Sequence, residues 1–245
     1  MKNYILIFLF FIFNPNTSFG SAMKFSSGLN SSDRKNIIET LGLTSISKVL
    51  GNPYPLGGHS GIEMGVETNL VNVERLSDLG NKDGAYKKEL IYYNLIFGKG
   101  LYHNIDFFFQ FAPLIQEEKI TSFGSQIRWM FFESQSLPAS LSLIIHNEST
   151  TFDNLVTTEN LGFNLVESVS IDDVSLFVGI GQNRCQGTFI GGAEGITDTG
   201  ETIKQDYFEK HSFMGLNIAT GKYFLAAQLD RFVNSQLSFK LGLRF

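Results

Sequence analysis

The carboxy-terminal end of the chain alternates strictly between apolar residues and polar or small residues. The apolar positions are Leu237, Phe239, Leu241, Leu243 and Phe245. Successive side chains of a strand point to opposite faces, so the alternation predicts a strand with one wholly apolar face. Such a strand needs lipid or a protein core against that face.

Nine further segments show the same two-residue period. With the last one, the expected strands are residues 58–71, 88–98, 105–116, 121–133, 138–148, 158–168, 173–184, 206–219, 222–231 and 237–245. Most of them exceed the five or six residues of an ordinary globular strand. Their length is what a tilted strand needs to cross the hydrocarbon layer of a membrane.

The face opposite the apolar one is rich in Gly, Ser, Asn and Gln, which suits a narrow, filled lumen. Unsatisfied peptide groups are costly in hydrocarbon, so a sheet that spans it must close on itself. We therefore predict an all-β protein, an up-and-down antiparallel transmembrane β-barrel of about ten strands. The alternative is a soluble β-sandwich or clam-shaped protein with the apolar face turned inward.

Composition excludes some classes of function. The chain has 24 Phe, 24 Gly and only 5 Pro, which suits long paired strands. Its 24 acidic residues against 19 basic ones give a net charge of −5, which argues against a nucleic-acid partner. Cys185 is the only cysteine, so the monomer has no internal disulfide.

The two ends of the sequence together carry a resemblance. Lys2 and the apolar run from Tyr4 to Phe13, followed by small residues, predict a signal peptide over residues 1–22 that is too short to anchor a membrane protein. With its Phe-terminated last strand, the chain resembles small β-barrel proteins of the outer membrane of Gram-negative bacteria. The resemblance implies contact with outer-membrane lipid, recognition of the last strand by the barrel-assembly machinery, and periplasmic amino and carboxy termini.

Residues 23–57 lack strand alternation and precede the barrel, which we assign to residues 58–245. Ser31, Ser32 and Asp33 favour a helix start, and the segment ends in a Gly and Pro-rich stretch. The segment has three possible positions: inside the lumen, across the periplasmic mouth, or against the inner leaflet. A ten-strand bore is only slightly wider than one that side chains fill, so we expect a periplasmic lid or a partial plug.

The connections between the strands are unequal in length. Those on the side of the carboxy terminus are short, and the longest ones on the other side span residues 72–87, 148–157 and 185–205. Short periplasmic turns and long outer loops are typical of outer-membrane barrels. These three loops are the expected contact surface for an external partner.

Ionisable residues fall on the inward face of the expected strands. The polar positions predicted to line the lumen are Glu63, Glu67, Asp106, Arg128, His146, His211, Asp230, Lys240 and Arg244. Closure of the barrel brings Glu63 and Lys240 to similar heights, which predicts an ion pair. Such pairs are usually structural, because charges in a narrow lumen need partners. No catalytic residue, metal ligand or cofactor is assigned.

The outward face carries aromatic side chains that suit the membrane interfaces. They are Tyr93, Phe97, Trp129, Tyr223 and Phe245. The first hypothesis is a non-enzymatic outer-membrane barrel with a structural or receptor role through its outer loops. The second is a porin-like narrow channel for small solutes, gated by the segment before the barrel. The third is a hydrolase at the outer rim, as in the omptin proteases, using His146 or His211.

Overall fold

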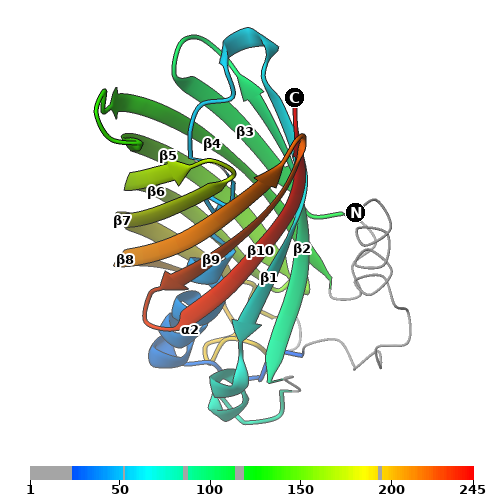
Figure 1. Ribbon diagram of the computed structural model, residues 1–245. Coiled ribbons are helices and arrows are strands. Elements are labelled where there is room, and N and C mark those ends of the chain that lie inside the picture. Colours follow the sequence, from blue (N-terminus) through cyan, green and yellow to red (C-terminus); the bar gives the residue numbers. More distant parts are fainter. Residues whose placement is uncertain (1–23, 52, 85–87, 114–118, 193–194) are drawn as a thin grey trace.

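The computed structural model describes residues 24–245 except 52, 85–87, 114–118 and 193–194 (Figure 1). The expected signal peptide lies outside these residues. Within the described part, no helix combines the length and the apolar character needed to cross a bilayer.

Ten antiparallel strands close into a barrel, as the sequence predicted. They are β1 Ile62–Asn72, β2 Glu89–Gly100, β3 Ile105–Phe111, β4 Ile120–Glu133, β5 Ala139–Phe152, β6 Val156–Ile171, β7 Val174–Phe189, β8 Ile203–Thr220, β9 Tyr223–Arg231 and β10 Ser235–Arg244. Each strand pairs with its neighbours in sequence, and β1 pairs with β10. Because the ring is closed, neither β1 nor β10 has a free hydrogen-bonding edge.

Five short helices accompany the strands in the described part of the chain. They are α2 Ser31–Ile37, the π-helix η1 Ile38–Gly42, and the 3₁₀ helices η2 Leu43–Ser45, η3 Gly58–Ser60 and η4 Glu74–Asp78. The side chain of Asn30, one residue before the serines that suggested a helix start, accepts hydrogen bonds from the backbone N–H groups of Ser32 and Asp33. The carboxylate of Asp33 accepts the N–H of Asn30 in return, which completes a capping box.

The two mouths of the barrel differ. The short-turn mouth carries the connections 101–104, 134–138, 172–173 and 221–222, together with Phe245. The long-loop mouth carries the connections 73–88, 112–119, 153–155, 190–202 and 232–234. In Figure 1 the short-turn mouth is at the top, beside the label of the carboxy terminus, and α2 is at the opposite mouth.

One of the three expected loops is not a loop. Residues 148–157 belong mostly to β5 and β6, and only residues 153–155 connect these strands. The turn is tight because Asp153 and Asn154 adopt positive φ angles of 50° and 58°. The expected loop 185–205 similarly shrinks to residues 190–202. Polar outward residues on these strand ends looked like loop sequence, but they remain paired in the barrel wall.

The outward face of the wall changes character along β7. From the short-turn mouth it presents Val174, Leu176, Val178 and Ile180, all more than 40% exposed. Beyond Ile180 the outward positions are Gln182, Arg184, Gln186 and Thr188. The inward positions at that end are apolar, with Cys185 and Phe189 fully buried. At β7 the wall therefore has an apolar exterior near the short-turn mouth and a polar exterior near the long-loop mouth.

Candidate functional site: a threaded lumen

Residues 24–51 and 53–57 lie along the lumen from one mouth to the other. At the long-loop mouth, the N–H of Leu29 donates to the carbonyl of Ile196 at 2.7 Å, and Leu29 forms a parallel bridge with Thr197. At the short-turn mouth, the N–H of Leu56 donates to the carboxylate of Asp106, and Arg244 donates to the carbonyl of Tyr54 at 2.8 Å. The segment is thus a plug along the barrel, not a lid across one mouth.

Small residues make room for this plug where the narrow bore seemed to forbid it. A Cβ atom added to Gly42 would lie 2.6 Å from the Sγ atom of Cys185, so η1 contacts β7 at its backbone. In the same way, a Cβ at Gly187 would lie 2.7 Å from a side-chain carbon of Ile38. Close packing of this kind leaves no space for larger residues at either position.

The threading also separates the two ends of the described chain. Phe25 and Leu29 belong to the long-loop mouth, whereas Phe245 pairs with Ile62 at the short-turn mouth. The start of the described plug and Phe245 therefore lie at opposite mouths, whereas the amino terminus itself, which was expected on the same side as the carboxy terminus, is outside the described residues. Sequence reasoning counted the strands correctly, but it took the start of the plug to lie beside the start of β1.

An apolar seal fills the lumen near the long-loop mouth. It joins residues of the plug, of the connections and of the wall in one buried cluster: Phe25, Leu29, Ile37, Ile38, Leu41, Leu43, Ile46, Val71, Val73, Leu76, Leu79, Leu90, Tyr92, Ile120, Phe152, Leu155, Val156, Cys185, Phe189, Ile196 and Phe232. Such a cluster resembles the core of a soluble domain. Its burial favours the threaded position of the plug over exposure of its apolar residues.

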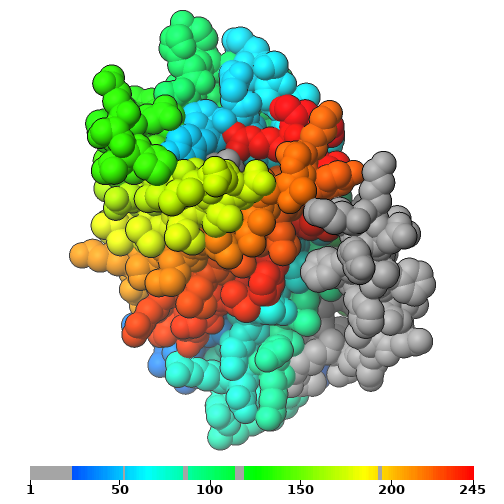
Figure 2. All heavy atoms as spheres, in the orientation of Figure 1, coloured from blue at the N-terminus to red at the C-terminus, as the bar shows by residue number. Residues whose placement is uncertain are grey.

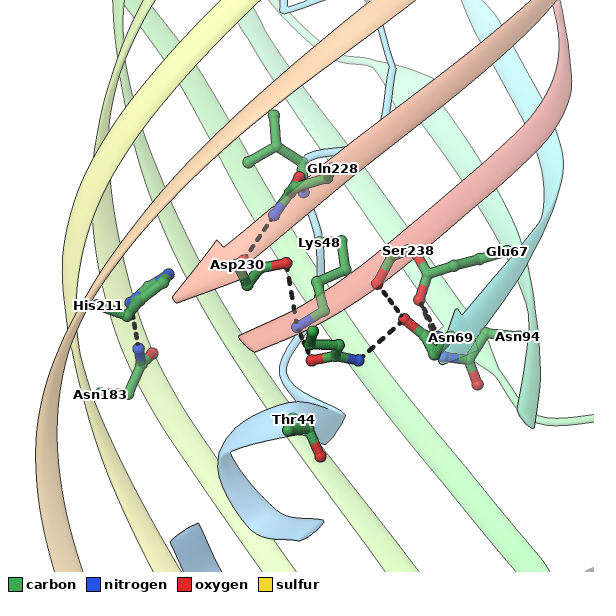
Figure 3. A network of polar contacts seen from close by, with 12 residues as sticks. Thr44, Lys48, Glu67, Asn69, Asn94, Asn183, His211, Gln228, Asp230 and Ser238 are labelled. Atoms are coloured by element: carbon green, nitrogen blue, oxygen red, sulfur yellow. Dashed lines mark hydrogen bonds and ion pairs between the residues drawn. The ribbon is translucent and has the colours of Figure 1, made fainter. Parts of the chain in front are cut away.

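On the short-turn side of the seal, Lys48 is the centre of a polar layer (Figure 3). Its Nζ atom donates to Gln236 at 2.9 Å and lies 3.7 Å from the carboxylate of Asp230. The next residue, Val49, donates its N–H to Gln228 at 3.0 Å, and Gln228 donates to Asp230 at 2.8 Å. The plug is thereby bonded to β9 and β10 through both a side chain and its backbone.

The polar layer extends to β1 and β2. The amide oxygen of Asn69 accepts hydrogen bonds from Ser238 at 2.7 Å and from Gln236 at 3.4 Å. The amide nitrogens of Asn69 and Asn94 donate to the carboxylate of Glu67 (Figure 3). Contacts from Lys48 to Glu67 therefore form one continuous chain across the barrel seam.

The opposite wall holds the plug as well. Ser47 donates to Gln110 at 2.8 Å, and the carbonyl of Lys48 accepts from Arg128 at 3.4 Å. Nearer the seal, Asn160 donates to the carbonyl of Gly42 at 2.9 Å. Polar backbone groups of the plug inside the barrel are satisfied in this way by side chains of the wall.

The structure contains the ion pair predicted between β1 and β10. Lys240 Nζ lies 2.6 Å from Glu63 Oε1, and both side chains are almost completely buried. The strand register aligns Lys240 with Glu67 and Glu63 with Arg244, so the pair is a diagonal contact across the seam. The ammonium also lies over the rings of Phe108 and Phe224.

The predicted lumen and interface residues are placed on the expected faces. Glu63, Glu67, Asp106, Arg128, His146, His211, Asp230 and Lys240 are buried inside the barrel, and Arg244 is partly buried there. On the outside, Phe97, Trp129, Tyr223 and Phe245 are 45–51% exposed and Tyr93 is half-buried. The alternation of each strand decided these faces.

The two histidines are inside the lumen, not at the rim. His211 contacts the amide of Asn183 at 2.8 Å, and His146 is 1% exposed. Among the described residues, neither imidazole has a hydrogen bond to a carboxylate, and no group of His, Cys, Asp or Glu has the arrangement of a metal site. The nearby Glu148 instead accepts a hydrogen bond from Ser122 at 2.7 Å.

Sequence reasoning missed the residues that hold the plug. Lys48 and Gln236 were outside the expected strands, and Gln228 was predicted only to face the lumen. One signal was present: Lys48 is a single cation within the apolar stretch Ile46–Leu50. A charge in such a stretch needs a buried partner of opposite sign.

Comparison with known proteins gives no match to a protein-family model and none to a curated protein. Among solved structures, the chain is similar to a loop L8 deletion mutant of OmpT, an outer membrane protein of Vibrio cholerae, with 10% identity, a TM-score of 0.32, and coverage of 64% of this chain and 54% of that chain. The chain thus spans about half the length of the Vibrio protein.

Two smaller proteins are matched over nearly their whole length. One is Ail, the attachment invasion locus protein of Yersinia pestis, in complex with the heparin analogue sucrose octasulfate: 15% identity, TM-score 0.30, 76% of this chain and 97% of that chain. The other is Neisserial surface protein A: 8% identity, TM-score 0.30, 75% of this chain and 94% of that chain. The assignment of the fold rests on the chain's own strand pairing, because these scores are low.

Proposed function

We propose that this protein is a plugged outer-membrane β-barrel that displays a folded platform at its long-loop mouth. The platform consists of residues 24–30 together with the described residues of the connections 73–88 and 190–202. In this proposal the short-turn mouth faces the periplasm, and the processed amino terminus lies on the cell surface. The barrel-assembly machinery would read the last strand, and the role of the platform is structural or receptor-like, without catalysis.

The proposal rests on the contacts that join three chain segments at the long-loop mouth, where the lumen is filled. The N–H groups of Gly28 and Leu29 donate to the carbonyls of Gly195 and Ile196 in the connection 190–202, at 2.8 and 2.7 Å. Arg34 of the following helix α2 lies 2.9 Å from Asp198 in the same connection. Ser27 donates its N–H and its hydroxyl to Asp83 of the connection 73–88, at 2.7 and 2.8 Å. A loop surface fixed by such contacts is suited to recognition, because binding then costs little ordering entropy.

Lipid contact is supported by the apolar exterior near the short-turn mouth. Large side chains from several strands are exposed there, among them Ile127, Trp129, Phe163, Leu176, Met214 and Leu225. A water-soluble protein rarely exposes a continuous apolar belt of this kind. The length asymmetry of the connections supports the orientation, with the long loops outside.

Site-specific labelling of intact cells tests the proposal. With Cys185→Ser as the background, single cysteines replace Lys24, Ser77, Thr199 or Asp173, all of which are exposed. We expect a membrane-impermeant maleimide to label the Lys24→Cys, Ser77→Cys and Thr199→Cys variants on intact cells. The Asp173→Cys variant, in a turn of the short-turn mouth, should react only after permeabilisation. The reverse pattern, or recovery of the chain in the soluble periplasmic fraction, would overturn the proposal.

A channel is the second candidate, favoured by unsatisfied polar groups along the lumen wall. Among the described residues, both amide atoms of Asn217 and both ring nitrogens of His146 are buried without a hydrogen-bond partner. Such a wall suits a hydrated path once the plug moves. We expect the full chain to be silent in planar bilayers. Voltage-dependent single-channel steps that accompany maleimide labelling of Cys185 would favour the channel.

A further inference from the structure

Two cationic side chains lie next to each other on the outside of the wall. Arg231 of β9 pairs in register with Ser212 of β8, and Lys210 is two residues further along β8 on the same outward face. Diagonal neighbours of this kind are within reach of each other's long side chains. Both residues are exposed, and the described part of the chain provides no ion pair for either. Arg184, by contrast, lies 3.1 Å from Asp206.

An apolar groove begins beside this basic pair. It has a volume of about 580 Å³ and extends across β6 to β9, with Leu165, Ile180, Met214, Leu229 and Arg231 among its lining residues. An adjoining hollow of about 690 Å³ is lined by Phe163, Gln182, Lys210 and Arg231. This part of the wall is seen in Figure 2, where β7 is yellow, β8 orange and β10 red. The basic pair thus closes one end of an apolar trough.

The pair lies where the exterior changes from apolar to polar. On β8 the outward sequence runs from Met214 through Ser212 to Lys210, and on β9 it runs from Leu229 to Arg231. In the proposed orientation this is the level of the lipid headgroups in the outer leaflet. Anionic headgroups attract basic residues at this level.

We propose that Lys210 and Arg231 bind the phosphate of one phosphorylated lipid, whose acyl chain lies along the apolar groove. Charge complementarity carries the choice of ligand, because a basic pair stands out on a chain with a net charge of −5. The guanidinium of Arg231 offers two parallel donors to a phosphate, and Lys210 adds a point charge. Glu167, the acid that lines the groove, is on β6, three strands away from Arg231.

The inference rests on the proposed membrane insertion, so insertion is measured first. Wild-type protein is reconstituted with lipid vesicles and followed by flotation. Failure to float would sink the proposed function together with the lipid site. Flotation without any preference among lipids would remove the lipid site alone.

Binding is then measured by native mass spectrometry of the full chain in non-ionic detergent. The probes are diphosphoryl lipid A, its dephosphorylated counterpart and inorganic phosphate. Two cations near the surface contribute about 1 kcal/mol each, so we expect the Lys210→Gln/Arg231→Gln variant to bind diphosphoryl lipid A about thirtyfold more weakly. The matched control Lys204→Gln/Lys222→Gln removes the same charge elsewhere and should bind like wild type.

Several results would overturn the site. Equal binding of the phosphorylated and dephosphorylated lipids would show that the phosphate is not recognised. Equal loss of lipid binding in both double variants would show that the effect comes from net charge alone. If inorganic phosphate bound as tightly as the lipid, the groove would not contribute to binding through the acyl chain. A heat-dependent shift on detergent gels confirms that each variant is folded.

Discussion

The two halves of the barrel wall are built for different surroundings. Near the short-turn mouth the inside buries the charged residues Glu63, Lys240 and Asp106 beside small apolar clusters, and the outside is apolar. Near the long-loop mouth the inside contains the apolar seal, and the outside carries charged and amide side chains such as Arg184 and Asp206. On β7 the same two-residue period therefore carries opposite polarities at the two ends of the strand, whereas β2 and β10 keep Ile91 and Leu237 exposed near the long-loop mouth.

With the proposed membrane insertion, the change along β7 marks where the lipid ends. A strand in lipid needs apolar residues outside. Inside, it tolerates polar residues only where they are paired. A strand beyond the membrane faces water outside and gains stability from an apolar interior, as in a soluble domain. The plug passes through both environments, and its sequence changes accordingly from the apolar Ile37–Leu43 to the bonded Ser47 and Lys48.

The largest expected effect comes from disrupting the polar layer at Lys48. The Lys48→Met substitution removes the charge 3.7 Å from Asp230 and leaves that carboxylate buried and unpaired. A change of this kind costs about 3–5 kcal/mol. We expect a lower midpoint of urea unfolding in detergent, and faster reaction of Cys185 with maleimide because the plug loosens.

Two matched variants sharpen this prediction. Lys35 lies on α2 in an exposed pair with Glu39, at 3.6 Å, so Lys35→Met should change stability by no more than about 1 kcal/mol. Adding Asp230→Asn to Lys48→Met should restore part of the loss, because the unpaired charge disappears. If Lys35→Met and Lys48→Met were equally stable, the polar layer would not hold the plug.

The next effect contrasts an apolar residue in the seal with one on the exterior. Leu41 is 1% exposed and Leu165 is 43% exposed. Leu41→Ala leaves a cavity and should cost about 2–5 kcal/mol. Leu165→Ala should stay within about 0.5 kcal/mol, because detergent or lipid fills the space of the lost methyl groups. Urea unfolding of the two variants in the same micelles measures the difference, and equal losses would contradict a soluble-like core inside the outer half.

The faces of the strands were predictable because a period of two leaves only two choices. Once Phe97 is outward, Ile96 must be inward, and closure then brings Glu63 near Lys240. The strand ends were harder. Toward the long-loop mouth the outward residues of β5 to β8 become polar, so Ser149 and Thr151 read as a loop although they are paired with β6.

The plug was not predictable in position because its fit depends on residues far apart in sequence. Gly42 can pass Cys185 and Thr158 only because it has no side chain, and this contact joins the plug to two strands. No local pattern reveals how wide the bore is at that height. The partners of Lys48 likewise come from β9 and β10, almost two hundred positions later.

The smallest expected effect tests the platform through pH. Hydrogen bonds from the backbone and the hydroxyl of Ser27 hold the pKa of Asp83 below the ordinary carboxyl value of 3.8. A lowered pKa means that the contact contributes fully above pH 3.8 and is lost as the pH falls through the lower value. We expect the amide of Ser27 to exchange faster with deuterium near pH 3 than near pH 5, after correction for the intrinsic rate. In Asp83→Asn this protection should no longer depend on pH, whereas a pH dependence that persisted in Asp83→Asn would assign the change to another carboxylate and leave the platform without its second anchor.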